Sequence, residues 1–344
     1  MEEALLKQKI DSIFNKILNQ KSDAWNLNIN QWDWSCGVGL FGLVKAFQAT
    51  RDVKYKEFIR NWFDKNGESR YYGSVNNVAP VNAVLFLLQE YGDEYSSTVC
   101  KDYAVWCMKY ALRTTNGGFA HIWIGGDEDY KNQLWIDTIF MAGVFMLKYG
   151  VFTKNDALIK EALKQIDLHI ECLIDPVNDL FYHGYQCIKK IHMGEHWGRG
   201  NGWMIASLVE LIEVLKDNGY EVTKYIEVLK RVMKKAYDLK TEDGMLRTLL
   251  LVEESYKETT ATSLFGYAAL KGFQMGVLDE RFLEWGNQIV KTVTGFIAEN
   301  GAIAHCSYGT NPESREVYMT RPCDQSLYAD GIVLMLLAQA IHHK

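Results

Sequence analysis

One aspartate in the sequence is placed where a carboxyl group could do proton-transfer chemistry. Asp137 lies in the segment "NQLWIDTIFMAG", between Trp135 and Phe140, in or near the first turn of an otherwise apolar helix. A carboxylate buried in such surroundings is costly unless it is paired or used. Burial among aromatic rings raises the pKa of a carboxyl group, whereas a helix N-terminus lowers it. The segment is therefore typical either of a helix-capping aspartate, which is the commoner arrangement, or of a general acid and base.

A second segment combines a cation with aromatic side chains. "HWGRGNGWMIASLVELIEVL", residues 196–215, places Arg199 and two tryptophans among three glycines, directly before an apolar stretch with helical spacing. The glycines predict a tight loop that leads into a buried helix. Because the whole chain has a formal net charge of −6, an anionic ligand has to be bound by a local cation of this kind.

Two other motifs resemble cofactor or metal sites, but their context does not fit. "CGVGLFG" has the Gly37-x-Gly39-x-x-Gly42 spacing of a dinucleotide loop without the strand that must precede it, so its glycines indicate close helix packing. "HMGEH", residues 192–196, has the spacing of a zinc site, yet Gly194 lies inside it and "WGRGNG" follows at once. We therefore expect no metal and no cofactor.

The composition is that of a globular protein with a large core. The 344 residues are 48% hydrophobic and 23% charged, and only 4 are proline, which argues against linkers and disordered tracts. With a net charge of −6 and a pI near 5.8, the chain lacks the basic footprint of a nucleic-acid-binding protein. We expect one domain that spans residues 1–344.

The first twenty residues and the cysteines bear on the compartment. "MEEALLKQKIDSIFNKILNQ" has apolar residues at helical intervals but no continuous apolar core, so it predicts an amphipathic helix and no secretory signal. No stretch approaches the roughly 20 apolar residues of a membrane span. The seven cysteines are scattered, without a C-x-x-C pair, which is typical of reduced thiols. We expect a cytoplasmic protein that binds neither membranes nor nucleic acids.

These segments have to be positioned by helices, because apolar residues recur every three or four positions and strand-like alternation is almost absent. The spacing predicts twelve helices, at 3–20, 35–49, 52–64, 78–91, 93–112, 134–149, 153–173, 201–216, 219–238, 259–275, 279–297 and 325–342.

The predicted helices alternate between two kinds. Every second helix, such as 35–49 or 259–275, is apolar almost all round and is expected to be an inner helix. The others, such as 219–238, carry charges on one face and are expected to form an outer ring. Short connections join antiparallel helices in pairs. The pattern predicts an all-α fold, an (α/α)6 barrel of six helical hairpins, with an open helical solenoid as the alternative.

The long connections all precede an inner helix, at 21–34, 65–77, 113–133, 174–200, 239–258 and 298–324. Aromatic residues are frequent in them. Long loops without secondary structure are uncommon unless they are functional. We therefore expect these loops to meet at one end of the toroid and to form an aromatic pit of the kind that stacks on sugar rings.

Several motifs together resemble a known family. "GGFAHI", "LWIDTIFM", "LFYHGY", "WGRGNGW" and "KETTATSLFGYAALKG" occur in this order. In combination they closely resemble the unsaturated rhamnogalacturonyl hydrolases of glycoside hydrolase family 105, which are related to the unsaturated glucuronyl hydrolases of family 88. The similarity runs from "WDWSCGVGLFGL" to "RPCDQSLYADGIVLMLLAQ", nearly the whole chain. It implies an (α/α)6 barrel, in agreement with the helix pattern.

The resemblance implies hydration of the C4=C5 double bond that polysaccharide lyases leave on a nonreducing uronic acid. An aspartic acid protonates C4 and then, as a carboxylate, helps water add at C5, after which the hemiketal collapses and releases the sugar. Asp137 matches this aspartate. The implied partner is a small unsaturated oligosaccharide, first of all unsaturated galacturonyl-rhamnose from pectin. A general acid that works near neutrality needs a raised pKa, which tryptophan walls could supply.

The resemblance also implies the residues around the substrate. His183 in "YHGY" matches a histidine placed near the water and the catalytic aspartate. Arg199 and Trp203 match a cation and an indole beside the unsaturated sugar, and a planar arginine suits a carboxylate. The other expected substrate-binding residues are His121, Trp135, Trp32 and Trp34 in the pit.

One position departs from the related glucuronyl hydrolases. These have a second aspartate in the loop before the fourth helix, where this chain reads "SVNNVAPVNAV" with Asn76 or Asn77 in its place. An amide can bind a sugar hydroxyl or a water but cannot act as a carboxylate. We expect Asn77 to bind substrate, and a different rate or preference if the second charge matters.

Two other functions fit the same toroid. A sugar epimerase of the N-acylglucosamine class would use histidines as acid and base instead of Asp137. A noncatalytic carbohydrate-binding toroid would bind sugars without turnover. The sequence leaves the oligomeric state open.

Overall fold

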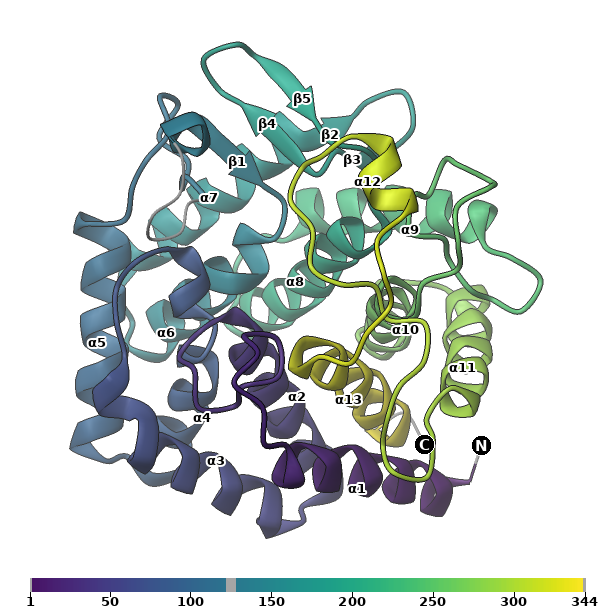
Figure 1. The fold of residues 1–344 in the computed structure, drawn as a ribbon. Helices are drawn as coiled ribbons and strands as arrows, with labels where there is room; N and C mark the ends of the chain where they lie inside the picture. Colours follow the sequence, from purple (N-terminus) through teal and green to yellow (C-terminus); the bar gives the residue numbers. More distant parts are fainter. Residues whose placement is uncertain (1, 122–127, 343–344) are drawn as a thin grey trace.

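Figure 1 presents a computed structural model that describes residues 2–121 and 128–342. The inner helices are α2 (Trp34–Thr50), α4 (Val81–Tyr91), α6 (Val144–Phe152), α8 (Gly198–Asp217), α10 (Thr259–Gln274) and α13 (Leu327–His342). The outer helices are α1 (Glu3–Asn19), α3 (Val53–Asn66), α5 (Glu94–Lys109), α7 (Asp156–Leu173), α9 (Thr223–Leu239) and α11 (Glu280–Gly295). A short helix, α12 (Arg315–Met319), precedes α13.

The two kinds of helix differ in burial as the sequence predicts. Outer helix α9 buries one face, formed by Tyr225, Leu229, Val232, Met233 and Ala236. Inner helix α13 is instead buried at every position from 327 to 341. Each inner helix contacts the next, and α13 contacts α2, so the inner helices close into a ring. The predicted (α/α)6 barrel is confirmed.

Glycines close this ring between α2 and α13. A Cβ atom at Gly331 would lie 2.0 Å from the carbonyl oxygen of Val38, and one at Gly42 would lie 2.5 Å from the Cα atom of Gly331. Only glycine lets the two helices pack backbone against backbone. The glycines of "CGVGLFG" therefore serve helix packing, as expected.

Two small sheets form on the loop side of the ring. The first pairs β1 (Gln133–Trp135), β4 (Gly184–Gln186) and β5 (Ile191–Met193) as antiparallel strands in the order β1-β4-β5. The second pairs β2 (Ile174–Asp175) with β3 (Leu180–Phe181). In the first sheet Trp135 is opposite Gly184, which brings the segment after β1 next to the residues before β4.

Two predicted helix boundaries are wrong at this end of the molecule. The segment 134–149 is not one helix, because pairing with β4 extends the chain up to Trp135; a π-helical turn at Ile139–Gly143 then leads into α6. "WGRGNG" is not a loop but the first turns of α8. Its glycines permit close packing, since a Cβ at Gly198 would lie 2.5 Å from the carbonyl oxygen of Arg247.

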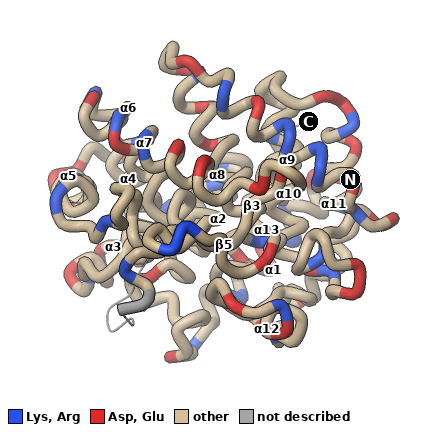
Figure 2. The backbone as a smooth tube through the Cα atoms, turned by 90° about the horizontal axis from the view of Figure 1, so that it is seen from above, with Lys and Arg blue, Asp and Glu red and all other residues tan. Residues whose placement is uncertain are grey.

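The surface of the molecule carries charged residues of both signs (Figure 2). In Figure 2, segments with Lys or Arg alternate with segments with Asp or Glu around the rim of the molecule. Within residues 2–121 and 128–342, no helix combines the length and the apolar character that a membrane crossing requires.

Candidate active site

A cavity of about 560 Å³ opens on the loop side of the ring. Its lining residues are Trp25, Asp33, Trp34, Tyr71, Ser74, Asn76, Asn77, His121, Trp135, Asp137, Met141, Trp197, Arg199, Gly309, Thr310 and Asn311. Most of them belong to the predicted long loops, so the expected aromatic pit is present. A concave site of this size with aromatic walls and a few polar groups is typical of small-molecule binding.

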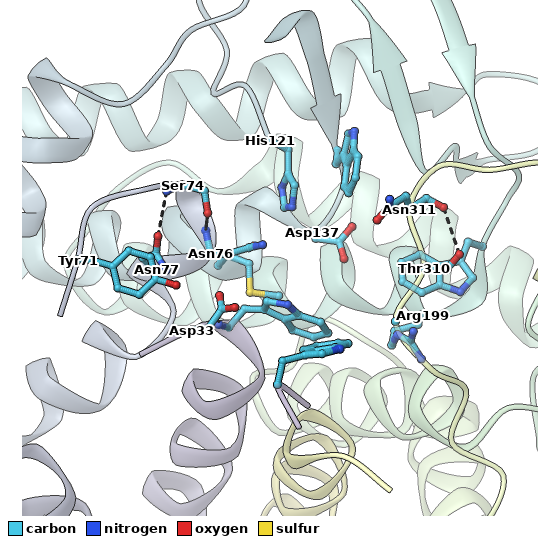
Figure 3. A pocket seen from close by; sticks show the side chains of 16 residues that line it. Asp33, Tyr71, Ser74, Asn76, Asn77, His121, Asp137, Arg199, Thr310 and Asn311 are labelled. Atoms are coloured by element: carbon cyan, nitrogen blue, oxygen red, sulfur yellow. Dashed lines mark hydrogen bonds between the residues drawn. The ribbon is translucent and has the colours of Figure 1, made fainter. Parts of the chain in front are cut away.

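Asp137 lies at the centre of this cavity in Figure 3. It occupies the turn between β1 and the π-helical turn, and none of the backbone N–H groups of residues 138–141 donates to its side chain, so Asp137 makes no capping hydrogen bond to this helix. The side chain of Asp137 is 14% exposed, and its Oδ2 atom lies 3.4 Å from Nε2 of His183. Neither of these two atoms has a hydrogen-bond partner within the described residues.

His183 lies behind Asp137, between β3 and β4. Its ring is 1% exposed and does not line the cavity itself. The ring stacks on the indole of Trp197, with centroids 4.3 Å apart, and Nδ1 lies 2.6 Å from the hydroxyl oxygen of Tyr318. The imidazole is therefore fixed on both sides, with Nε2 facing the carboxyl group of Asp137.

The surroundings of Asp137 favour the charged form of its carboxyl group. Burial would raise the pKa of Asp137, but the interactions with His183 and the proximity of His121 outweigh burial and lower it. Burial lowers the pKa of His183, and it lowers the pKa of His121 to about 4. This differs from the raised pKa expected for a general acid, because the sequence does not reveal that two histidines converge on this carboxylate.

His121 and Trp135 line the cavity beside Asp137, as expected. Their rings stack with centroids 4.5 Å apart and an interplanar angle of 12°. Nδ1 of His121 lies 2.9 Å from the hydroxyl oxygen of Thr138, and Nε1 of Trp135 donates to Gln133 at 2.8 Å. The two rings form one rigid wall of the site.

Arg199 lines the cavity too, but most of its guanidinium is already engaged. Nη1 donates to the carbonyl oxygen of Ser307 at 2.9 Å and to its Oγ at 2.7 Å, and Nη2 donates to the carbonyl oxygen of Tyr308 at 2.8 Å. Nε has no partner among the described residues, and the side chain is 1% exposed. Arg199 thus holds the segment 307–311 against the cavity, and its Nη1 also lies 3.7 Å from the carboxylate of the buried Glu258.

Three expected tryptophans have different positions. Trp34 lines the cavity, whereas Trp32 and Trp203 do not. Trp32 is 2% exposed and donates its Nε1–H to the carbonyl oxygen of Asn77 at 2.9 Å. Trp203 is fully buried and packs against Phe140, because it lies one helical turn further into the core than Arg199. In the described residues Trp34 thus belongs to the cavity wall, while Trp32 and Trp203 lie behind it.

The structure separates the two neighbouring asparagines. The amide oxygen of Asn77 accepts from the backbone N–H groups of Gly73 and Ser74 at 3.0 Å each, and its Nδ2 donates to the carbonyl oxygen of Trp32 at 3.2 Å. Asn77 therefore stabilises the loop at the cavity wall. Asn76 points toward the middle of the cavity in Figure 3, and no described residue hydrogen-bonds its amide group.

Sequence reasoning missed Asp33, a second carboxyl group that lines the cavity. Asp33 caps α2, since its side chain accepts from the backbone N–H of Trp34 at 2.8 Å. Burial raises its pKa, although this hydrogen bond acts in the opposite direction. The available signal was its place between the two tryptophans of "WDW".

The histidines of "HMGEH" do not form a metal site. The segment forms β5 and the bend after it, so its two histidines do not share a helix face. Nε2 of His192 lies 3.0 Å from the carbonyl oxygen of Cys172, and Nε2 of His196 lies 2.9 Å from Asp175. Within the part of the chain that the structure describes, no three His, Cys, Asp or Glu side chains are grouped to hold a metal ion.

Comparisons with known proteins agree with this fold and these motifs. The unsaturated rhamnogalacturonyl hydrolase YesR of Bacillus subtilis (strain 168) is 24% identical over 342 residues, which cover 98% of this chain and 96% of the relative. An unsaturated 3S-rhamnoglycuronyl hydrolase of Formosa agariphila is 23% identical over 274 residues, 73% of this chain and 70% of the relative.

Solved structures share the fold over nearly the whole length. A possible member of the GH105 family from Salmonella enterica superposes with a TM-score of 0.95 at 23% identity, covering 99% of this chain and 95% of the other. The unsaturated glucuronyl hydrolase of Bacillus sp. GL1 superposes with a TM-score of 0.74 at 19% identity, covering 96% and 94%. The profile of Glycosyl Hydrolase Family 88 matches residues 9–344, and the chain belongs to this family.

Proposed function

We propose that this protein is a hydrolase that removes Δ4,5-unsaturated uronic acid from the nonreducing end of lyase-generated oligosaccharides, first of all unsaturated galacturonyl-rhamnose. The observation that carries the proposal is Asp137 paired with the buried His183 in an aromatic cavity. The names of the relatives, rhamnogalacturonyl and rhamnoglycuronyl hydrolases, support the substrate class. We place the activity in the cytoplasm, with the scattered cysteines as support.

In the proposed reaction the carboxyl group of Asp137 donates its proton to C4, and the electrons of the C4=C5 bond form the new C–H bond. Positive charge then develops at C5 and is shared by the ring oxygen. Water adds to C5 and returns a proton to Asp137. The hemiketal opens to a ketone at C5, and C1 releases the next sugar as an alcohol. Because the anomeric carbon is not attacked, the usual pair of carboxyl groups around the glycosidic bond is not needed.

The neighbourhood of Asp137 suits a water molecule that must be bound and deprotonated. Oδ2 of Asp137 and Nε2 of His183 are buried polar atoms without partners among the described residues. Such atoms are normally satisfied by a water or a ligand. A water that reaches both atoms would be held within proton-transfer distance of the carboxylate.

The lowered pKa of Asp137 is that of the free enzyme. A bound sugar displaces water from the walls and strengthens the burial that raises this pKa. Since only the protonated acid can start the reaction, we expect the activity to be higher at mildly acidic than at alkaline pH.

The uronate carboxylate has one basic partner in the cavity. Arg199 is the only lysine or arginine among the described lining residues. An arginine has five N–H donors, and Nε together with the second Nη2 hydrogen forms an edge that can hold a carboxylate by two parallel bonds. The amide of Asn76, the hydroxyl of Thr310 and the carboxyl of Asp33 are placed to bind sugar hydroxyls.

A panel of lyase-generated disaccharides from pectin and other uronate polymers tests the proposal, because the hydrolase removes the ultraviolet absorbance of the conjugated double bond. We expect Asp137→Asn to lower kcat by at least about 100-fold, the usual contribution of a general acid, while it keeps the fold and disaccharide binding. Asp33→Asn, the other cavity carboxyl, is the matched variant and should retain measurable turnover.

The same panel separates the alternatives. An epimerase would change sugar stereochemistry without loss of the ultraviolet absorbance. A noncatalytic toroid would bind a disaccharide without turnover in the wild-type protein. Turnover that survives in Asp137→Asn but not in Asp33→Asn would move the acid to Asp33.

A further inference from the structure

Tyr318 lies outside the cavity, on the far side of His183 from the substrate. It belongs to α12, in the long segment between α11 and α13, and its side chain is 1% exposed. Its hydroxyl oxygen lies 2.6 Å from Nδ1 of His183. The backbone N–H of Glu313 donates to the same oxygen at 3.3 Å.

These contacts determine which ring nitrogen of His183 carries the hydrogen. A tyrosine hydroxyl has one hydrogen to donate and lone pairs to accept with. Among the described residues the hydroxyl group of Tyr318 meets one N–H donor, that of Glu313, and the ring nitrogen Nδ1 of His183, so Nδ1 is the atom that can accept the hydroxyl hydrogen. A neutral imidazole that accepts at Nδ1 must carry its hydrogen on Nε2. Nε2 is the atom that faces Asp137 at 3.4 Å.

We propose that Tyr318 is a positioning residue that fixes His183 as the neutral tautomer with hydrogen on Nε2. The proposal rests on the proposed function of Asp137. In this tautomer Nε2 of His183 can donate to the carboxylate or to the water, but it has no lone pair with which to accept the proton of Asp137. The proton of Asp137 is therefore kept for C4 of the substrate.

Double protonation of His183 is opposed by the same arrangement. An imidazolium would place a hydrogen on Nδ1 opposite the hydroxyl group of Tyr318, so the hydroxyl hydrogen would lose its acceptor. The charged groups that act on His183 are Asp137 and Glu313, which favour protonation, and Arg199, which opposes it together with burial. Burial is the largest of these influences and lowers the pKa of His183.

A glycine makes the contact between Tyr318 and His183 possible. A Cβ atom at Gly194 would lie 2.5 Å from the hydroxyl oxygen of Tyr318 and 3.0 Å from Cβ of His183. Gly194 also has a φ of +69°, which disfavours other residues. Gly194 is the glycine inside "HMGEH". The residue that does not fit a helical zinc motif therefore leaves room for the hydroxyl group of Tyr318.

The direct test is the tautomer of His183 in the wild-type protein, read from long-range proton–nitrogen correlation spectra after labelling histidine with ¹⁵N. His183→Gln identifies the resonances by their loss. We expect the neutral Nε2–H form throughout pH 7–8. A neutral Nδ1–H form, or an imidazolium in this range, would overturn the proposal without any variant having to fold.

Tyr318→Phe tests the consequence for catalysis. Loss of one hydrogen bond to Nδ1 should lower kcat by about tenfold, with little change in KM, and let a second tautomer or the imidazolium appear. Tyr225→Phe is the matched control, because Tyr225 is also buried and donates one hydrogen bond, to Asp167, on the outer helix α9. Gly194→Ala keeps the tyrosine but displaces its hydroxyl, and should shift the spectrum in the same direction.

The outcomes separate this proposal from the proposed function. An unchanged spectrum and unchanged kcat in Tyr318→Phe contradict the positioning role alone. If no unsaturated disaccharide is hydrolysed by the wild-type protein, the proposed function fails, whatever the tautomer.

Discussion

Replacement of His183 by phenylalanine should raise the pKa of Asp137 and move the pH dependence of the enzyme. Phenylalanine keeps a flat ring against Trp197 but removes the nitrogen that lies 3.4 Å from Oδ2 of Asp137. In the wild-type protein the interactions with His183 are the main reason why burial does not raise this pKa. Without them burial prevails, so the carboxyl group holds its proton to higher pH.

The size of the shift follows from the contact that is lost. A hydrogen bond to a charged group is worth about 1.5–3 kcal/mol. Nε2 and Oδ2 lie 3.4 Å apart and do not form a hydrogen bond of normal geometry, so the lower value is the upper bound of what their contact contributes. Because about 1.4 kcal/mol corresponds to one pKa unit, we expect the pKa of Asp137 to rise by up to about one unit.

The assay is kcat/KM against pH on an unsaturated disaccharide, which reports the pKa values of the free enzyme. A general acid is active when protonated, so the limb on which activity falls with rising pH should move upward by up to about one unit in His183→Phe. His196→Gln is the control, because His196 also pairs with an aspartate, Asp175, at 2.9 Å but does not line the cavity.

A limb that stays in place, or that moves to lower pH, would refute the reasoning. An equal shift in His196→Gln would show that the effect is not local to Asp137. A lower kcat without any shift would assign His183 to the handling of water alone.

Two further substitutions test separate parts of the structure. Arg199→Lys loses the planar fork, so KM for an unsaturated uronate should rise about tenfold or more. The rise should be smaller for an analogue in which a neutral amide replaces the carboxylate. Equal losses on both substrates would mean that Arg199 only anchors the segment 307–311. Glu210→Gln should lower the free energy of unfolding by about 3–5 kcal/mol in chemical denaturation, because the fully buried Glu210 carboxylate contacts the ammonium groups of Lys45, Lys148 and Lys271. Glu213→Gln removes a carboxylate whose side chain is 40% exposed and should cost far less.

The helices could be predicted because their signals are local. The spacing of apolar residues within one segment, as in α9, depends only on which face is buried. Alternation of all-apolar and one-sided segments then implies two concentric rings, and short connections make neighbours antiparallel. This reasoning needs no contact between distant parts of the chain, and the structure confirms it.

The errors arise where distant segments meet. Trp135 belongs to a strand because β4, about fifty residues later, pairs with it, and no local pattern signals that pairing. Trp32 and Trp34 are two residues apart, yet the start of α2 at Trp34 turns only the second toward the cavity. Tyr318 is 135 residues from His183 in a segment without a motif, so its contact with Nδ1 could not be anticipated.

The structure changes the interpretation of the missing second aspartate at positions 76 and 77. The amide of Asn77 is hydrogen-bonded within its loop, and Asn76 can offer only an amide group. The described lining of the cavity nevertheless contains two carboxyl groups, those of Asp137 and Asp33. Their surroundings push the two pKa values apart: histidines lower the pKa of Asp137, while burial raises that of Asp33. Such a separation assigns different protonation states to neighbouring acids. Burial shifts Asp33 toward its protonated form, and in that form the group can donate a hydrogen bond to the sugar without repelling the uronate that Arg199 has to hold.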